Sequence, residues 1–467
     1  MTRRIITAVL RFALRIFFRR IEVAGLERVP DGGALIFVLN HPNGLVDPAF
    51  LLCHAPRPVS FLAKSTLFKA PILGFFVRAL DAIPVYRKQD AGEDTSRNHE
   101  TFARAHQLLT SGGTIAVCPE GVSHSEPSLR PLKSGAARIA LGAASTNTKS
   151  GAALNLQIVP AGLYYTAKTS FRSAALLYFG DPISVAPIAL DADGEPPREA
   201  VRELSDRIAN ALREATLNAD HHEALQTVAR AERIFSSADD APEEERSLAQ
   251  ELSLRRRFVE GYAFHRTQSP ERLAALDARI RRYEEELQQA GLDAHDFSPA
   301  TVEKHSGVGH LVTRGLLFLT LALPALAGAL VHYPAYRLAG LFATKFSRNY
   351  DDVVSTIKVI SALLLFPLTW LAPSTLAFFF VGWKTALAVF LFAPLAGFVA
   401  VRFSEEFDRF IAGTRAVQFF VTERRFFRQL LTERRAIRRE ILTLGDEAAR
   451  AGALETLFDS NTVRKRI

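Results

Sequence analysis

Two residues suited to proton transfer follow one apolar, strand-like run of the sequence. His41 lies two residues after Ala34–Leu39, and Asp47 follows six residues later. An imidazole titrates near neutral pH and can take a proton from an alcohol, and a carboxylate on its second ring nitrogen fixes the tautomer and stabilises the imidazolium. Residues six apart point to different faces of a helix, so this pair meets only across a turn, which Pro42 and Gly44 favour. The pattern predicts a general base with its orienting carboxylate, although alone it also fits a structural histidine.

Three further stretches place charged residues beside strand-like runs in a fixed order. They are Ala63–Gly74, Ile83–Arg87, and the run Thr114–Cys118 that leads into Pro119-Glu120-Gly121. A last strand-like segment covers Ile158–Gly162. Such charges are most often solvated surface groups, so their order along the chain is the informative feature.

Four blocks resemble, in order, the four motifs of the glycerolipid acyltransferase superfamily (PlsC-like): the His41–Asp47 block, residues 63–87, residues 114–121 and residues 158–162. Further stretches are similar to the fungal-type glycerol-3-phosphate/dihydroxyacetone-phosphate acyltransferases: Pro119–His124, Leu132–Ala137 and Phe171–Ala175. The resemblance covers residues 21 to 190. One feature departs from the general family pattern, because five residues instead of four separate His41 from Asp47.

The resemblance implies a role for each candidate site residue. His41 is the expected catalytic base and Asp47 its orienting partner, with no covalent enzyme intermediate. A phosphate on the acceptor needs fixed cations, and Arg87 offers a planar fork while Lys64 offers a point charge. Lys133 is expected to add to this positive cleft, and Glu120 resembles the family's acceptor-binding glutamate. Backbone N–H groups near Gly121 or Gly44 are candidate donors to the oxyanion.

The composition limits the class of partner. A net charge of +8 over 467 residues favours anionic partners, either nucleic acid or an anionic membrane. Nucleic acid is not expected, because the arginines cluster beside apolar segments instead of forming an aromatic-laced soluble patch. The two cysteines, Cys53 and Cys118, indicate neither a disulfide framework nor a metal cluster. No metal or cofactor is expected, and an acyl-CoA or acyl carrier protein thioester is the expected co-substrate.

The N-terminal residues 1–20 predict a basic amphipathic helix on a membrane surface. Four arginines fall within about 80° on a helical wheel, opposite an apolar face. Arginines interrupt any signal-peptide core, which favours a helix lying in the headgroup region. A helix that covers the core of its own domain is the alternative. The arginines are Arg4, Arg11, Arg15 and Arg19.

The next two segments differ in their periodicity. Residues 21–215 alternate strand-like runs with helical stretches, which predicts an α/β acyltransferase domain, a mixed sheet flanked by helices. Residues 216–306 form a charged helical extension. Within it, Ser269-Pro270 fits a helix start, an apolar seam follows, and Gly291 fits a stop. We expect this short seam to pack within the chain instead of forming a coiled-coil dimer.

Membrane segments are predicted in residues 307–402, followed by a basic helical tail over residues 403–467. The apolar stretches 315–336 and 359–383 are each long enough to cross a hydrocarbon layer, and 385–401 is borderline. Basic residues in the loop 337–358 and in the tail place both on the cytoplasmic side. This favours a hairpin over 359–401 with Lys384 at its far tip, and an interfacial or re-entrant 315–336.

The leading hypothesis is an integral membrane glycerol-3-phosphate acyltransferase whose catalytic domain is on the cytoplasmic face. Its partners would be a phosphorylated glycerol acceptor, an acyl thioester donor and membrane phospholipids, and dihydroxyacetone phosphate is a further candidate acceptor. One alternative is a lysophosphatidate or other lysophospholipid acyltransferase. The other is a lipid-binding membrane protein with a degenerate site.

Overall fold

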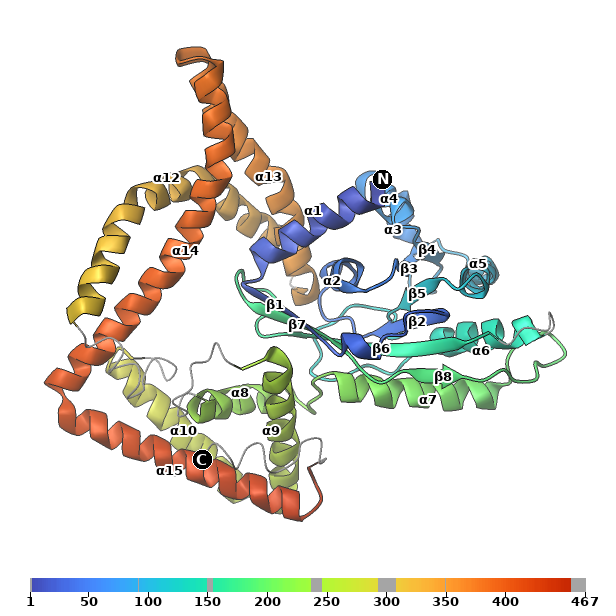
Figure 1. Ribbon diagram of the computed structural model, residues 1–467. Helices are drawn as coiled ribbons and strands as arrows, with labels where there is room; N and C mark the ends of the chain where they lie inside the picture. Colours follow the sequence, from blue (N-terminus) through green and yellow to red (C-terminus); the bar gives the residue numbers. More distant parts are fainter. Residues whose placement is uncertain are drawn as a thin grey trace. The chain divides into compact units, whose positions relative to one another are not determined.

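The computed structural model describes residues 2–90, 92–148, 154–236, 246–292, 308–348 and 350–454. Its elements fall into two compact units (Figure 1). The first unit contains Met1–Asn218 and Gly340–Ser361, and the second contains Ala219–Ala339 and Ala362–Ile467. The sequence alone did not indicate that 340–361 group with the N-terminal half.

The first unit is built on an eight-stranded mixed sheet, which confirms the predicted α/β class. The strand order is β1-β7-β6-β2-β5-β3-β4, and β8 pairs with β6. Strand β2 is parallel to both β5 and β6, whereas β7 is antiparallel to β6. The strands are β1 Arg20–Ala24, β2 Ala34–Leu39, β3 Ser60–Lys64, β4 Ile83–Val85, β5 Thr114–Val117, β6 Leu156–Tyr165, β7 Ala174–Phe179 and β8 Ile183–Val185.

The parallel strands β2, β3, β4, β5 and β6 end at one common edge of the sheet. Strand β6 runs furthest, because Ala161 lies opposite Leu39 and the strand continues to Tyr165. In open α/β sheets, ligands bind at the carboxyl ends of parallel strands. This edge therefore receives the loops that carry the candidate residues.

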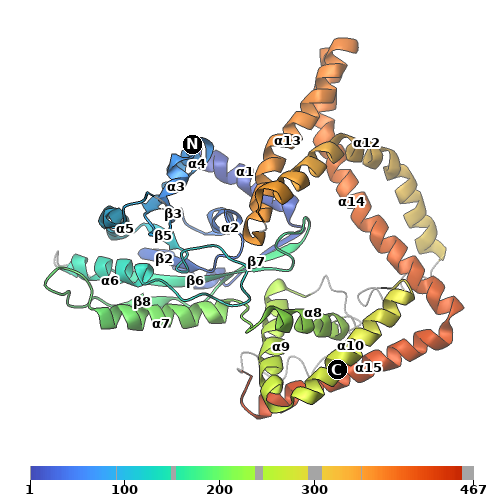
Figure 2. The ribbon, with the colours of Figure 1, turned by 180° about the vertical axis from the view of Figure 1, so that it is seen from behind.

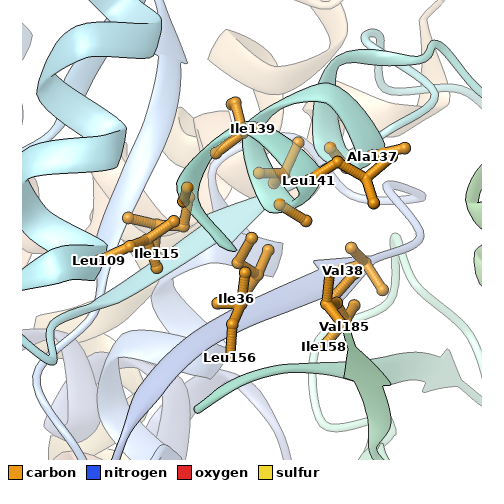
Figure 3. Close-up of a cluster of buried hydrophobic side chains, with 14 of the residues drawn as sticks. Ile36, Val38, Leu109, Ile115, Ala137, Ile139, Leu141, Leu156, Ile158 and Val185 are labelled. Atoms are coloured by element: carbon orange, nitrogen blue, oxygen red, sulfur yellow. The ribbon is translucent and has the colours of Figure 1, made fainter. Parts of the chain in front are cut away.

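Helices cover both faces of the sheet. All six residues of β2 are buried, as expected for a central strand that is covered on two sides. Ile36 and Val38 contribute to a cluster with residues of α5, α6 and α7. Figure 3 shows the part of this cluster formed with α5 and α6. Helices α1 and α2 lie on the opposite side of the sheet from α7 (Figures 1 and 2). These helices are α1 Thr2–Phe17, α2 Val46–His54, α5 Asn98–Thr110, α6 Gly135–Thr148 and α7 Arg198–Ala215.

Helix α1 has features both of a helix that covers the core of its own domain and of a helix that lies on a membrane surface. One side is buried in its own unit, and the Arg11 guanidinium donates to the Cys53 carbonyl oxygen at 2.6 Å. Another side exposes large apolar side chains, which suits contact with a lipid surface. The buried residues are Ile6, Ala13, Leu14 and Phe17, and the exposed apolar ones are Ile5, Val9 and Phe12.

The second unit joins two segments that the sequence presented as separate. Helices α8 His222–Ser236, α9 Leu248–Gln268 and α10 Pro270–Gln289 pack with α15 Arg424–Arg450, so the basic tail is part of a bundle. The seam of α10 packs within the chain, as predicted, and ion pairs such as Arg279–Glu433 join the two helices. Local periodicity identifies each helix but not its distant partner. The buried seam residues are Leu276, Ile280, Tyr283 and Leu287.

Three helices in the described residues are long and apolar enough to cross a membrane: α12 Val308–Phe346, α13 Asp351–Phe380 and α14 Trp383–Thr422. They expose large apolar side chains and mark the chain as a membrane protein. Helix α12 is continuous although it contains Pro324 and Pro334, and α14 extends well beyond the predicted 385–401. Helices α13 and α14 form a hairpin whose turn adjoins Lys384, as predicted (Figure 1).

Candidate active site

The predicted base and carboxylate meet at the edge of the sheet. His41 Nδ1 lies 2.9 Å from Asp47 Oδ2, although five residues separate the two. A turn closed by the Val46 N–H on the Asn43 carbonyl oxygen, with Gly44 at φ +45°, brings Asp47 back toward β2. The Asp47 side chain is fully buried and that of His41 is 19% exposed. Nε2 is therefore the imidazole nitrogen that a substrate hydroxyl can reach.

Two further donors hold the Asp47 carboxylate. The Asn43 N–H donates to Oδ2 at 2.7 Å, and the Tyr165 hydroxyl donates to Oδ1 at 2.6 Å. Burial, reinforced by the Asp47 charge, raises the pKa of Tyr165 well above its usual value, so this phenol remains a donor. The arrangement holds the Asp47 carboxylate aimed at His41. Sequence reasoning missed Tyr165, whose only signal is its position at the end of β6.

Glu120 is buried behind the histidine. Its Oε1 accepts from the His41 N–H at 3.1 Å, and its Oε2 accepts from the Arg130 N–H at 2.8 Å. His124 Nε2 lies 2.5 Å from the same Oε2, and the His124 N–H donates to the His41 carbonyl oxygen at 3.1 Å. Glu120 thus holds the backbone of the base directly at its N–H and, through His124, indirectly at its carbonyl oxygen. None of these hydrogen bonds involves an acceptor substrate, so the predicted acceptor-binding role of Glu120 stays a separate prediction.

The predicted cations gather around one carboxylate, that of Asp90. Arg87 donates from Nε at 2.8 Å and from Nη2 at 2.7 Å to Asp90. This pairing, together with the charges of Lys64 and Lys133, lowers the pKa of Asp90. The guanidinium fork of Arg87 is therefore engaged by Asp90, which the sequence did not single out although it lies three residues after Arg87. A phosphate entering here would compete with Asp90 for the fork.

Gly121 connects this positive cluster to the Glu120 turn. Its φ is +76°, and an added Cβ would lie 2.6 Å from Lys133 Nζ. Its carbonyl oxygen accepts from Arg87 Nη1 at 2.8 Å, and its N–H donates to the Cys118 carbonyl oxygen at 3.0 Å. The Gly121 amide is thus already used within the turn and is a poor oxyanion donor.

The other expected oxyanion donor is the N–H of Gly44, whose neighbouring amides already have acceptors. Those of His41, Asn43 and Leu45 donate to Glu120, Asp47 and Thr356. Within the described residues, the Gly44 N–H has no hydrogen-bond acceptor. An N–H group held by a fixed turn near the base has the preorganisation that oxyanion stabilisation requires.

Metal ligands are the remaining possibility for such a polar site. In the described part of the chain, no group of three or more His, Cys, Asp or Glu side chains is placed to hold a metal ion. The chemistry that the site supports is proton transfer by His41 next to a cluster of cations.

Comparison with known proteins gives two family matches. Residues 20–164 match the Acyltransferase family, and residues 231–449 match the glycerol-3-phosphate acyltransferase 2 C-terminal domain. The first match contains His41, Asp47 and the cation cluster. The second match runs from the charged extension through the basic helix α15. This agrees with the packing of α8, α9 and α10 against α15.

Three curated relatives are similar over most of the chain. An acyltransferase of Schizosaccharomyces pombe is 26% identical, covering 85% of this chain and 73% of its own. Glycerol-3-phosphate O-acyltransferases 1 and 2 of Saccharomyces cerevisiae are 25% and 24% identical, covering 81% and 77% of this chain. The chain spans 61% and 63% of the length of these two relatives.

One solved structure is also similar. The 1-acyl-sn-glycerophosphate (LPA) acyltransferase PlsC from Thermotoga maritima is 19% identical, with 46% of this chain and 79% of that chain covered and a TM-score of 0.33.

Proposed function

Because the chain belongs to the glycerolipid acyltransferase superfamily, with a PlsC-like domain followed by a glycerol-3-phosphate acyltransferase C-terminal domain, we propose that it acylates the sn-1 hydroxyl of glycerol 3-phosphate. The observation that carries the proposal is the His41–Asp47 pair beside the cluster of Lys64, Arg87 and Lys133. The names of the two Saccharomyces cerevisiae relatives support the same acceptor.

The reaction follows from the geometry of the dyad. His41 Nε2 takes the proton of the acceptor hydroxyl, and that oxygen attacks the carbonyl carbon of an acyl thioester. The Gly44 N–H, which has no acceptor within the described residues, would donate to the oxyanion of the tetrahedral intermediate. Collapse of the intermediate breaks the C–S bond, and the thiolate leaves with the proton that the imidazolium returns. Asp47 stabilises the imidazolium throughout, so no covalent enzyme intermediate is required.

The acceptor is argued from charge. A phosphate carries close to two negative charges at neutral pH, and the three cations around Asp90 offer more positive charge than that single carboxylate offsets. Arg87 would bind phosphate oxygens through its fork, and Lys64 and Lys133 would add point charges. The same chemistry suits dihydroxyacetone phosphate. It also suits lysophosphatidate, which is the acceptor in the alternative function.

Membrane fractions containing the wild type or His41→Ala test the proposal. Each is supplied with labelled glycerol 3-phosphate, dihydroxyacetone phosphate or lysophosphatidate, and with either an acyl-CoA or an acyl carrier protein thioester. We expect the wild type to acylate glycerol 3-phosphate and the variant to lose about 10²–10⁴-fold or more in rate at equal abundance. His99→Ala, an exposed histidine that contacts the Ser96 carbonyl oxygen, is the matched control.

Other outcomes identify the alternatives. Acylation of lysophosphatidate alone would indicate the lysophospholipid acyltransferase. A wild type that binds lysophosphatidate without acylating any acceptor would indicate the non-enzymatic, lipid-binding protein. An active His41→Ala enzyme would overturn the assignment of the base.

A further inference from the structure

Helix α2, which carries Asp47, begins without a cap from its own sequence. Its N-cap residue is Leu45, whose side chain cannot accept a hydrogen bond. The backbone N–H groups at a helix start need acceptors, and Ser, Thr, Asp or Asn normally supply them. Here the Leu45 N–H donates to Thr356 Oγ1 at 3.0 Å. The acceptor thus comes from α13, 311 residues further along the chain.

Gly44 shows how closely α13 approaches this turn. A Cβ at Gly44 would lie 2.8 Å from Thr356 Oγ1 and 2.9 Å from the Asp352 carbonyl oxygen. Both distances are shorter than a side-chain carbon tolerates. The backbone of α13 therefore packs directly against the segment that joins His41 to Asp47, within the same compact unit.

The same turn of α13 also holds the loop that follows Glu120. The Ser123 hydroxyl donates to the Asp352 carboxylate, whose residue is only 7% exposed. Asp352 and Thr356 are one helical turn apart and lie on the same face. One face of α13 thus contacts both loops that fix His41, the His41–Asp47 turn and the Glu120 loop.

A third loop, between β6 and β7, completes the contact. The fully buried Ser355 hydroxyl donates to the Lys168 carbonyl oxygen, and Lys358 Nζ donates to the Thr169 carbonyl oxygen at 2.8 Å. Lys168 Nζ in turn donates to the Pro42 carbonyl oxygen at 3.0 Å and to Ser125 Oγ at 2.7 Å. Lys168 is half-buried, and this burial lowers its pKa against the opposing effect of nearby carboxylates, Asp352 first among them.

From these contacts we infer that the first turns of α13 are a positioning element of the active site. Thr356 supplies an acceptor for the N–H of Leu45 at the start of α2, and Asp352 fixes the neighbouring loop, so that His41 and Asp47 hold their reactive geometry. Thr356 and Asp352 are positioning residues, because they act through the two loops and touch no reacting atom. The inference rests on the proposed acyl transfer. A misplacement of about 1 Å at a catalytic group can lower a rate about 10²-fold.

Kinetics of Thr356→Val test this assignment, since valine keeps the shape of threonine and removes the hydroxyl. We expect kcat to fall about 10-fold to 100-fold while KM for both substrates stays within about twofold, because the hydroxyl touches neither substrate. Thr356→Ser should restore most of kcat by returning the acceptor for Leu45. Thr369→Val is the matched control on the same helix, since its hydroxyl donates to the Phe366 carbonyl oxygen.

A glycine pair gives an independent measurement. Gly44→Ala should lower kcat because its new Cβ collides with α13, whereas Gly112→Ala, also at positive φ but with nothing within 4 Å, should keep it. An unchanged kcat in Thr356→Val would overturn the inference, as would equal losses in Thr356→Val and Thr369→Val or a Thr356→Ser variant as slow as Thr356→Val. A wild type without acyl transfer would instead contradict the proposed function, so the two failures are distinguishable.

Discussion

The Tyr165 hydroxyl donates a 2.6 Å hydrogen bond to Oδ1 of Asp47, the oxygen that does not face the imidazole. Strand β6 makes this contact possible because it continues past the end of its parallel neighbour β2. The phenol and the imidazole therefore hold the carboxylate from two sides. Each oxygen of Asp47 has at least one donor.

Tyr165→Phe should lower kcat about 10-fold, since a hydrogen bond to a charged group contributes about 1.5–3 kcal/mol. Without the phenol hydroxyl, the Asp47 carboxylate loses the donor to Oδ1 and orients the imidazole less firmly, so fewer molecules hold the reactive geometry. Tyr178→Phe, which removes a hydroxyl bonded to Arg28, is the control. An unchanged kcat in Tyr165→Phe would contradict this role of Tyr165.

Glu120→Gln should distinguish a positioning carboxylate from one that binds the acceptor. The amide keeps one acceptor oxygen but points an NH2 group at the N–H of either His41 or Arg130. We expect kcat to fall about 10²-fold with little change in acceptor KM, because the base is displaced. Glu126→Gln removes an exposed partner of Arg130 and should leave both constants unchanged. A rise confined to acceptor KM would instead show that Glu120 contacts the substrate.

Arg87→Lys should raise KM for the phosphorylated acceptor more than KM for the thioester donor. The charge stays, but the fork is lost. Lys64→Ala should act in the same direction. Arg138→Lys, which alters an arginine paired with Glu195, serves as the control. If only donor kinetics changed, Arg87 would belong to the donor site.

Asp90→Asn should lower acceptor KM about threefold, because the carboxylate that competes for Arg87 loses its charge while Lys64 and Lys133 remain. Arg87 itself keeps one hydrogen bond to the asparagine oxygen. The measurement is acceptor KM at neutral pH, where the lowered pKa of Asp90 keeps the wild-type carboxylate fully ionised. A higher KM would mean that Asp90 serves mainly to orient Arg87.

The topology prediction follows from the contact between Thr356 and Leu45. The start of α13 and the catalytic domain must lie on the same side of the membrane, so we predict that α12 enters and leaves on that side although its length would allow a crossing. Impermeant maleimide applied to intact cells should label a single cysteine at residue 384 and not at 348 or 446. Background labelling of the two native cysteines should be low, because maleimide reacts with the thiolate. Burial raises the pKa of Cys53 to about 11 and that of Cys118 well above its usual value.

The labelling has three informative alternatives. Labelling at 348 would show that α12 crosses the bilayer. Labelling at 446 without labelling at 348 would show an odd number of crossings between α13 and the end of α15. Absence of labelling at 384 would show that the hairpin tip is not exposed on the outer side of the membrane.

The sequence predicted the parts of the site that lie within short motifs. His41 and Glu120 lie just past the ends of β2 and β5, Asp47 begins the helix that follows His41, and the parallel pairing of β2 with β5 brings the two strand ends together. Tyr165 was not predictable in this way, because its contact depends on how far β6 extends beyond β2. A strand pattern gives the element but not its stagger against a neighbour.

The role of α13 was harder still to predict. Its apolar composition indicates a membrane segment, and nothing in that pattern suggests that Asp352 and Thr356 bond to loops that lie 229 and 311 residues earlier. The missing cap at Leu45 is the only local sign, since it shows that the helix start needs an outside acceptor. The pairing of Asp90 with Arg87 had a weaker sign in the sequence, which is the position of Asp90 three residues after this arginine.

The pairing of β1 with β7 has a consequence for synthesis on the ribosome. Strand β1 lies beside β7 in register from Arg20 with Ala174 to Ala24 with Tyr178. At about 5–20 residues per second, β7 emerges roughly 8–30 s after β1, and through that interval the first strand has no edge to join. A nascent chain stopped after β6 would already contain His41, Asp47, Glu120 and Tyr165. It would nevertheless leave β1 unpaired and the helix before it without an anchor in the sheet, making such intermediates natural clients for chaperones.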